Sequence, residues 1–131
     1  MQTERKNDRL HAVYYLQQII KLSYSDANEA YEALVKHDDN DKYNISLGYL
    51  SMSQRSHLEA MRIYWENELD HHEIESYFSS YEDYAFQLKQ VITDKDQNTS
   101  WLYSSHEKLI DAWKSTDEFL SDWIKENIKI K

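Results

Sequence analysis

One heptad pattern constrains the fold of this 131-residue chain more than any other feature. Residues on one helical face recur at alternating steps of three and four, and all of them except Gln17 are apolar or aromatic. These residues are Leu10, Val13, Gln17, Ile20, Tyr24, Ala27, Tyr31 and Leu34. We predict a helix over residues 5–37, on the order of 50 Å long, whose apolar face must be buried against the rest of the chain.

The remaining sequence also favours helices. It contains one Gly and no Pro, whereas a sheet protein needs more turn residues. Helical spacing of apolar residues predicts a second helix over 42–69, a third from Asp70 onward, a connection at 94–100 and a final helix. We predict one domain, residues 1–131, folded as an all-α antiparallel four-helix bundle with long helices. A three-helix bundle with one kinked long rod is the alternative.

The second helix is expected to bury its large apolar residues. This inner face would consist of Leu47, Leu50, Leu58, Met61, Trp65 and Leu69. Gln54 and His57 lie near the same face. Our hypothesis is that they form a buried polar layer with Gln17 of the first helix. Such a layer would fix the register of the helices.

The third helix has the most regular pattern in the sequence. Its predicted seam is Ile74, Tyr77, Tyr81, Tyr84, Leu88 and Val91. Phe86 falls on the opposite face and is predicted to be exposed. Asp70 and Glu73 have capping-box spacing at the start of this helix. Asn98 or Ser100 is expected to cap the last helix.

The charge of the protein is concentrated in the middle of the chain. Residues 26–83 contain fourteen acidic and four basic side chains, and the whole chain has a net charge of −9. Direct binding to nucleic acid needs clustered Lys and Arg, so we do not expect it. The sequence has no Cys and no apolar run of about 18 residues that would span a membrane. We expect a cytoplasmic protein without a signal peptide.

An acidic and aromatic segment is the main candidate for a functional surface. Between Ile63 and Leu88 the sequence contains no Lys or Arg. Helical spacing turns most aromatic residues of this segment inward and most acids outward, so the acids would attract a partner with a basic surface. The predicted partner-binding residues are Glu66, Glu68, Asp70, Glu73, Glu75, Glu82, Asp83 and Phe86. A solvated acidic face without a partner is the other interpretation.

A second apolar line lies on the back of the first helix. Tyr15, Ile19 and Leu22 follow one another at helical spacing. They are either part of a broad buried face or a contact surface for a partner or a homodimer.

Metal and cofactor chemistry is not expected. Di-metal helical bundles use two Glu-x-x-His pairs, and this chain has only the pair of Glu68 and His71. Residues 94–105 supply some oxygen ligands of a calcium loop but lack its Gly bend and its final Glu. We therefore predict no metal site and no cofactor.

One weak catalytic pattern is present near the N-terminus. Five residues separate Arg5 from His11, a spacing that resembles the Arg–His pair of the HEPN ribonucleases. The resemblance implies an Arg that stabilises phosphate and a His that acts as general acid or base. No phosphate-binding Gly-rich loop accompanies the pair.

These features favour a non-enzymatic protein that binds another protein and blocks or bridges it. The most specific version is an inhibitor of the anti-defence, immunity or antitoxin type, from a mobile element, that mimics nucleic acid toward a basic partner. A structural or assembly protein that homo-oligomerises is the first alternative. A small metal-dependent or HEPN-like ribonuclease is the second.

Overall fold

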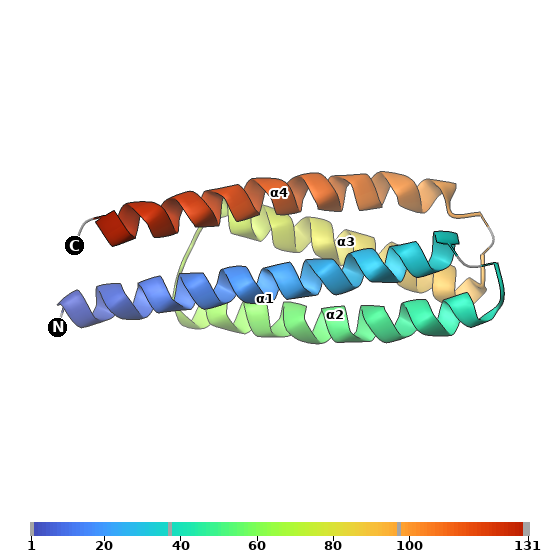
Figure 1. Cartoon of the computed structure of the whole chain (residues 1–131), viewed down its shortest axis with the longest axis horizontal. Coiled ribbons are helices and arrows are strands. Elements are labelled where there is room, and N and C mark those ends of the chain that lie inside the picture. The colour runs from blue at the N-terminus through green and yellow to red at the C-terminus, as the bar shows by residue number, and fades with distance from the viewer. Residues whose placement is uncertain (1, 37, 97, 130–131) are drawn as a thin grey trace.

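Four long helices form the protein. The computed structural model describes residues 2–36, 38–96 and 98–129, with side chains from residue 8 to residue 128 within these ranges. The helices are α1 (Gln2–Lys36), α2 (Asp41–Glu66), α3 (His72–Asp94) and α4 (Ser100–Lys129). Successive helices run in opposite directions and lie side by side (Figure 1). The predicted antiparallel four-helix bundle is confirmed. Because the chain reverses between α2 and α3, the three-helix alternative is wrong. Residue 37, the predicted end of the first helix, lies outside the described residues.

Small side chains form the contact between α1 and α2. The Ser23 hydroxyl donates a hydrogen bond to the backbone oxygen of Ser53 at 3.0 Å, and the Ser53 hydroxyl donates to the backbone oxygen of Ser23 at 2.6 Å. Farther along, the Ser46 hydroxyl donates to the backbone oxygen of Ala30 at 2.8 Å. A serine reaches the opposite backbone only when the two helices are close, so small residues set their separation.

The buried face of α1 is rotated relative to the predicted face. Every second predicted position is buried, namely Val13, Ile20, Ala27 and Leu34. The positions between them are half-buried. The aromatic ones contact α4, where Tyr24 stacks on Trp113 and Tyr31 stacks on His106, with ring centroids 4.3 and 3.8 Å apart. Residues on the other side of the predicted line are buried although they were not predicted, namely Leu16, Ser23 and Ala30.

The predicted inner face of α2 is largely wrong. Leu50 is buried, but Leu47, Leu58 and Trp65 are exposed, while Met61 and Leu69 are half-buried. The buried residues of this helix are Tyr43, Ser46, Leu50, Ser53, His57, Ala60, Ile63 and Tyr64. The close contact with α1 requires the small residues on the inside, and this turns the large apolar row of α2 outward.

The proposed polar layer does not form. The side-chain amide of Gln17 donates to the Asp117 carboxylate at 3.1 Å and to the Ser121 hydroxyl at 2.8 Å, both on α4. His57 instead bonds to Glu82 of α3. The buried polar network that joins three helices consists of Ser23, Ser53 and Tyr81, with the Ser53 and Tyr81 hydroxyl oxygens 2.7 Å apart.

The pattern of α3 is confirmed. All six predicted seam residues are buried, and Phe86 is exposed as predicted. The large rings of this helix fill the middle of the bundle. Tyr84, for example, crosses to α1 and donates its hydroxyl hydrogen to the backbone oxygen of Ala27 at 2.7 Å.

The connection between α2 and α3 is a tight corner, as predicted, but its cap is a different residue. The N-cap of α3 is His71, whose Nδ1 accepts a hydrogen bond from the Glu73 backbone N–H at 3.1 Å. The predicted capping box with Asp70 is therefore wrong. At the next connection Asn98 Oδ1 accepts from the Ser100 backbone N–H at 3.1 Å and so bonds the first N–H of α4, whereas Thr99, whose backbone oxygen accepts from Leu102 and Tyr103, occupies the cap position.

Replacing Ser53 by Ala tests the buried network. The change removes the partner of the Tyr81 hydroxyl in the core, so we expect a loss of about 1–3 kcal/mol in the free energy of unfolding. Chemical denaturation measures it. Ser51→Ala is the control, because Ser51 is exposed on the same helix and gains the same helix propensity. Equal effects of the two substitutions would contradict the role of the network.

Replacing Lys95 by Gly tests the end of α3. Lys95 has a φ of 50° and lies in the left-handed region, and its backbone N–H bonds to the Ile92 oxygen. Gly adopts this conformation without steric cost, so Lys95→Gly should stabilise the protein by about 1 kcal/mol. Lys95→Ala, which retains a Cβ, should bring no comparable gain in the same denaturation experiment.

Candidate functional site

The eight predicted partner-binding residues are divided between two places. The first group lies at the end of α2, in the corner and at the start of α3, and comprises Glu66, Glu68, Asp70 and Glu73. The second group lies farther along α3 and comprises Glu75, Glu82, Asp83 and Phe86. The contacts of the two groups differ, and these contacts determine which acids remain available to a partner.

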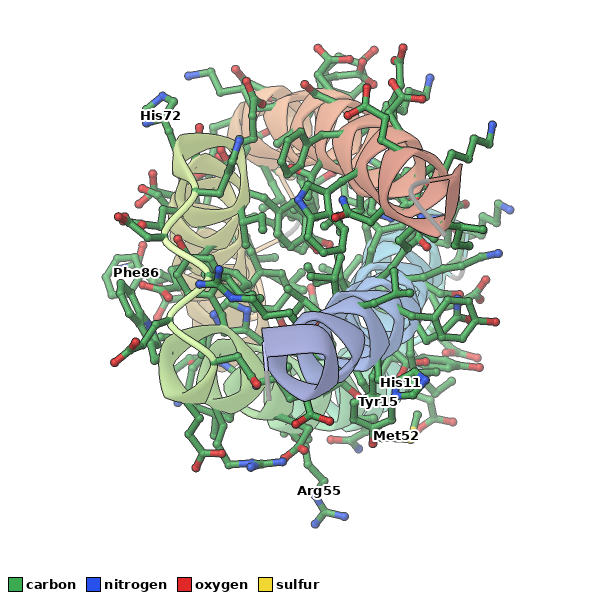
Figure 2. The ribbon with its side chains drawn as sticks, turned by 90° about the vertical axis from the view of Figure 1, so that its left-hand side faces the viewer. His11, Tyr15, Met52, Arg55, His72 and Phe86 are labelled. Atoms are coloured by element: carbon green, nitrogen blue, oxygen red, sulfur yellow. The ribbon has the colours of Figure 1, made fainter. Side chains whose placement is uncertain are left out.

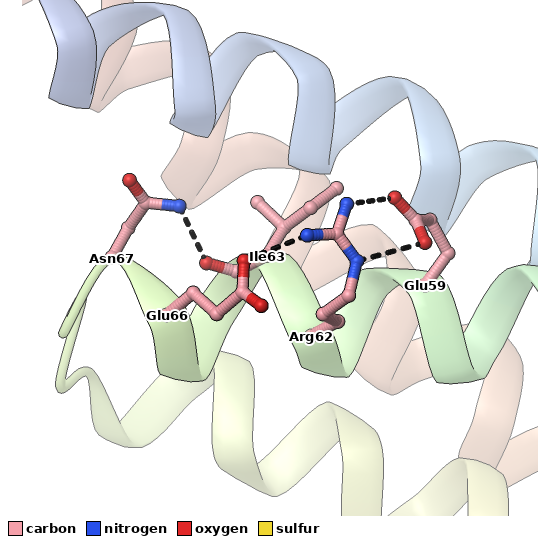
Figure 3. A network of polar contacts seen from close by, with 5 residues as sticks. All are labelled: Glu59, Arg62, Ile63, Glu66 and Asn67. Carbon is pink, nitrogen blue, oxygen red and sulfur yellow. Dashed lines mark hydrogen bonds and ion pairs between the residues drawn. The ribbon is translucent and has the colours of Figure 1, made fainter.

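Glu66 is held by a basic residue just outside the segment that lacks Lys and Arg. The Arg62 guanidinium contacts the Glu66 carboxylate at 2.7 Å and also binds Glu59 (Figure 3). These two carboxylates raise the pKa of Arg62 above its usual value, with Glu59 contributing most. One turn later the Asn67 side chain donates to the backbone oxygen of Ile63 at 2.8 Å. This surface of α2 is therefore a paired network within one helix.

Two of the remaining corner residues are tied to other helices, Glu68 to α1 through its backbone and Glu73 to α4, whereas Asp70 is exposed. Arg9 of α1 donates to the backbone oxygen of Glu68 at 2.8 Å, which brings a positive charge to the corner. The Ser115 hydroxyl donates to the Glu73 carboxylate at 3.3 Å, and the Thr116 hydroxyl donates to the Glu73 backbone oxygen at 3.2 Å. These contacts indicate that the corner closes the bundle, and they make it a less favourable docking surface than α3.

An exposed apolar surface lies where α2 faces α3. Leu58 is 66% exposed, Trp65 is 55% exposed and Phe86 is 65% exposed. Figure 2 shows Phe86 directed away from the bundle. Large apolar side chains with this exposure on neighbouring helices are typical of interaction sites, because binding of a partner removes their apolar surface from water.

A groove runs between these apolar side chains. One hollow of about 440 Å³ includes Leu58 and Phe86, a second of about 220 Å³ includes Trp65 and Glu75, and both are bordered by Glu82. We call this feature the α2/α3 groove. Its exposed or half-buried lining residues are Gln54, Leu58, Met61 and Trp65 on α2, and Glu75, Ser79, Glu82, Phe86 and Lys89 on α3.

Aromatic packing keeps the two walls of the groove apart. His57 of α2 stacks on Tyr81 of α3, with ring centroids 4.2 Å apart, and meets Phe78 edge-on at 5.3 Å. Tyr64 also meets Phe78 edge-on at 5.5 Å. Rings between α2 and α3 require a wider spacing than the serines between α1 and α2. The groove is a consequence of this difference.

Two carboxylates in the groove make hydrogen bonds with buried residues of α2. His57 Nε2 and the Glu82 carboxylate are 3.0 Å apart. Burial lowers the pKa of His57, and the bond to Glu82 opposes this shift. The Tyr64 hydroxyl donates to Glu75 at 2.5 Å, and burial together with this bond raises the pKa of Tyr64 to about 12. Both acids are thus positioned beside the apolar side chains.

The α2/α3 groove contains part of the site predicted from the sequence. Glu75, Glu82 and Phe86 were predicted site residues, and all three line the groove. Asp83 is exposed but is not among its lining residues. Leu58 and Trp65 were placed in the core and were missed as surface residues. The available signal was the row of small residues at Ser46, Ser53 and Ala60, spaced by seven, which marks the true inner face.

The second predicted surface, on α1, is also exposed. Tyr15 is 50% exposed, Leu22 is 52% exposed, and Ile19 between them is half-buried. Figure 2 shows Tyr15 and Met52 of α2 on the same side of the bundle. The interpretation of Tyr15 and Leu22 as buried residues is therefore wrong. Their role as a contact surface for a homodimer remains a prediction.

The residues considered for catalysis or metal binding lie apart. Within the described part of the chain, no three His, Asp or Glu side chains are grouped as metal ligands. His71 caps α3 and stacks on Phe119, whereas His72 is exposed and directed away from the bundle (Figure 2). His11 is exposed on α1, and the side chain of Arg5 lies outside the described residues.

Comparison with protein-family models, with curated proteins and with solved structures gave no match for this chain. Among the described helices, none has a stretch that is long and apolar enough to cross a membrane.

The state of His57 can be tested by the pH dependence of stability. Its lowered pKa in the folded protein means that the unfolded chain binds a proton more strongly, so stability should decrease as the pH falls below about 6.5. Compared with His57→Gln, wild type should lose stability as the pH falls through about 6.5 and below it. Denaturation at several pH values measures this difference, with the exposed His11→Gln as control. A difference that does not change with pH would contradict the assignment.

Proposed function

We propose that the protein is a cytoplasmic, non-enzymatic binding protein that takes up a basic segment of another protein in the α2/α3 groove. Binding would block or bridge that partner. The observation that carries the proposal is the exposure of Leu58, Trp65 and Phe86 along one groove that also contains Glu75 and Glu82. Apolar anchors beside acidic side chains are the arrangement expected for a specific and electrostatically guided contact with a basic partner.

The charge of the whole chain supports a basic partner. Residues 26–83, which include all of α2 and half of α3, contain fourteen acidic and four basic side chains. Such an excess of negative charge accelerates encounter with a basic surface and makes the association sensitive to salt. Basic surfaces often bind nucleic acid, so the most specific form of the proposal is an inhibitor of the anti-defence, immunity or antitoxin type.

A second candidate function is assembly through the exposed face of α1. Tyr15 and Leu22 are each at least half exposed beside Ile19, which supplies an apolar surface that a second copy could cover. This proposal predicts a molar mass that rises with concentration in light scattering. A monomer at all concentrations would contradict it.

Affinity capture from a cell lysate tests the binding function. The groove variant carries Glu75→Gln, Glu82→Gln and Phe86→Ser, which removes two charges and one exposed ring. The two amides retain hydrogen-bonding groups for Tyr64 and His57. We expect wild type to retain a protein that the groove variant loses, and expect retention to weaken when salt rises from about 0.05 to about 0.3 M.

A control variant on α4 makes the experiment specific. Asp111→Asn, Glu118→Gln and Tyr103→Ser also remove two charges and one exposed ring, and all three residues are exposed. The control should retain the partner as wild type does. Equal retention by the groove variant, or loss in both variants, would contradict binding in the groove.

A further inference from the structure

The walls of the α2/α3 groove restrict the backbone of an occupant. Both walls are helices, and no strand occurs in residues 2–36, 38–96 and 98–129. A β-strand peptide commonly binds by adding to an exposed sheet edge, which supplies partners for its backbone N–H and C=O groups. Helical walls use these groups internally. These walls therefore favour an occupant that satisfies its own backbone hydrogen bonds, as a helix does.

The side chains along both walls repeat with the same period. Leu58 and Trp65 are seven residues apart on α2, and Glu75 and Glu82 are seven residues apart on α3. Seven residues correspond to about 10.5 Å along a helix. A third helix in heptad register presents equivalent side chains at this interval. Such a helix would meet an apolar residue of α2 and an acid of α3 at each repeat.

The two walls differ in charge. The residues that α2 contributes to the groove carry no charge, whereas α3 contributes Glu75 and Glu82, with Lys89 at one end. Glu66 of α2 is held outside the groove by Arg62. A complementary helix therefore has an apolar side toward α2 and a basic side toward α3.

We propose that the occupant of the α2/α3 groove is an amphipathic basic α-helix of the partner protein, with apolar residues at heptad spacing and Lys or Arg along one flank. The geometry points to a helix of about three turns, because the groove extends from Gln54 to Trp65, or about 16 Å. This inference rests on the proposed function and specifies its partner. It predicts a helix, rather than a strand or a disordered basic tail, as the bound form.

Two synthetic peptides test the inference on the full chain. Both have the same Leu, Lys, Ala and Gln composition and a length of about three heptads. In the first peptide Leu occurs at heptad spacing with Lys on one flank. In the second the same residues alternate with the period of a strand. We expect the heptad peptide to bind at least about tenfold more tightly and to gain helical circular dichroism on mixing.

Two variants locate the binding. The double substitution Leu58→Ser and Trp65→Ser should lower the affinity for the heptad peptide at least about tenfold. Tyr14→Ser with Tyr103→Ser removes two equally exposed residues elsewhere and should leave affinity unchanged. Glu75→Gln with Glu82→Gln provides a second test if the apolar variant does not fold, and it should weaken binding and reduce its salt dependence.

Each of the other outcomes overturns the inference. Equal affinity for both peptides would mean that the groove responds to charge alone. Binding without a gain of helical signal, or binding that survives the groove variants, would mean a different bound form or place. Failure of both peptides to bind would also overturn it. If lysate capture still depends on the groove in these cases, the proposed function stands without the helical partner.

Discussion

The close contact of α1 with α2 determines the rest of the bundle. Ser23 and Ser53 exchange hydrogen bonds with each other's backbone, and Ser53 also meets the Tyr81 hydroxyl. This arrangement fixes the register of three helices in a buried position, where an unpaired hydroxyl is costly. It also places the small residues of α2 inward. Leu58 and Trp65 are consequently turned toward the outside, where they become walls of the groove.

The fold was predictable where burial follows side-chain size. In α3 the large apolar residues are also the inner ones, so spacing alone located its seam and the exposed Phe86. In α2 the rule failed, because a close helix pair needs Ser and Ala inside, and a search for large apolar residues selects the wrong face. In α1 the same effect moved the buried face toward Ser23 and Ala30.

The candidate site was predictable only in part, because the availability of an acid depends on residues that are distant in sequence. Arg9 of another helix brings a positive charge to the corner by bonding the backbone oxygen of Glu68, and Glu66 is paired with Arg62 just beyond the acidic segment. Neither contact follows from the count of charges in a window. Glu82 remains at the groove because its partner is a buried His57, whose pKa is lowered, rather than a cation such as Arg. Structure thus separates acids that close the bundle from acids beside an apolar groove.

The α2/α3 groove, and not acidity in general, is the interaction surface that we propose. NMR mapping of backbone amide chemical shifts during titration with the heptad peptide distinguishes the two. We expect changes concentrated at residues 54–65 and 75–89, with little change at the acids of α4 or at Tyr15 and Leu22. Changes spread over all acidic surfaces, or concentrated on the exposed face of α1, would contradict binding in the groove.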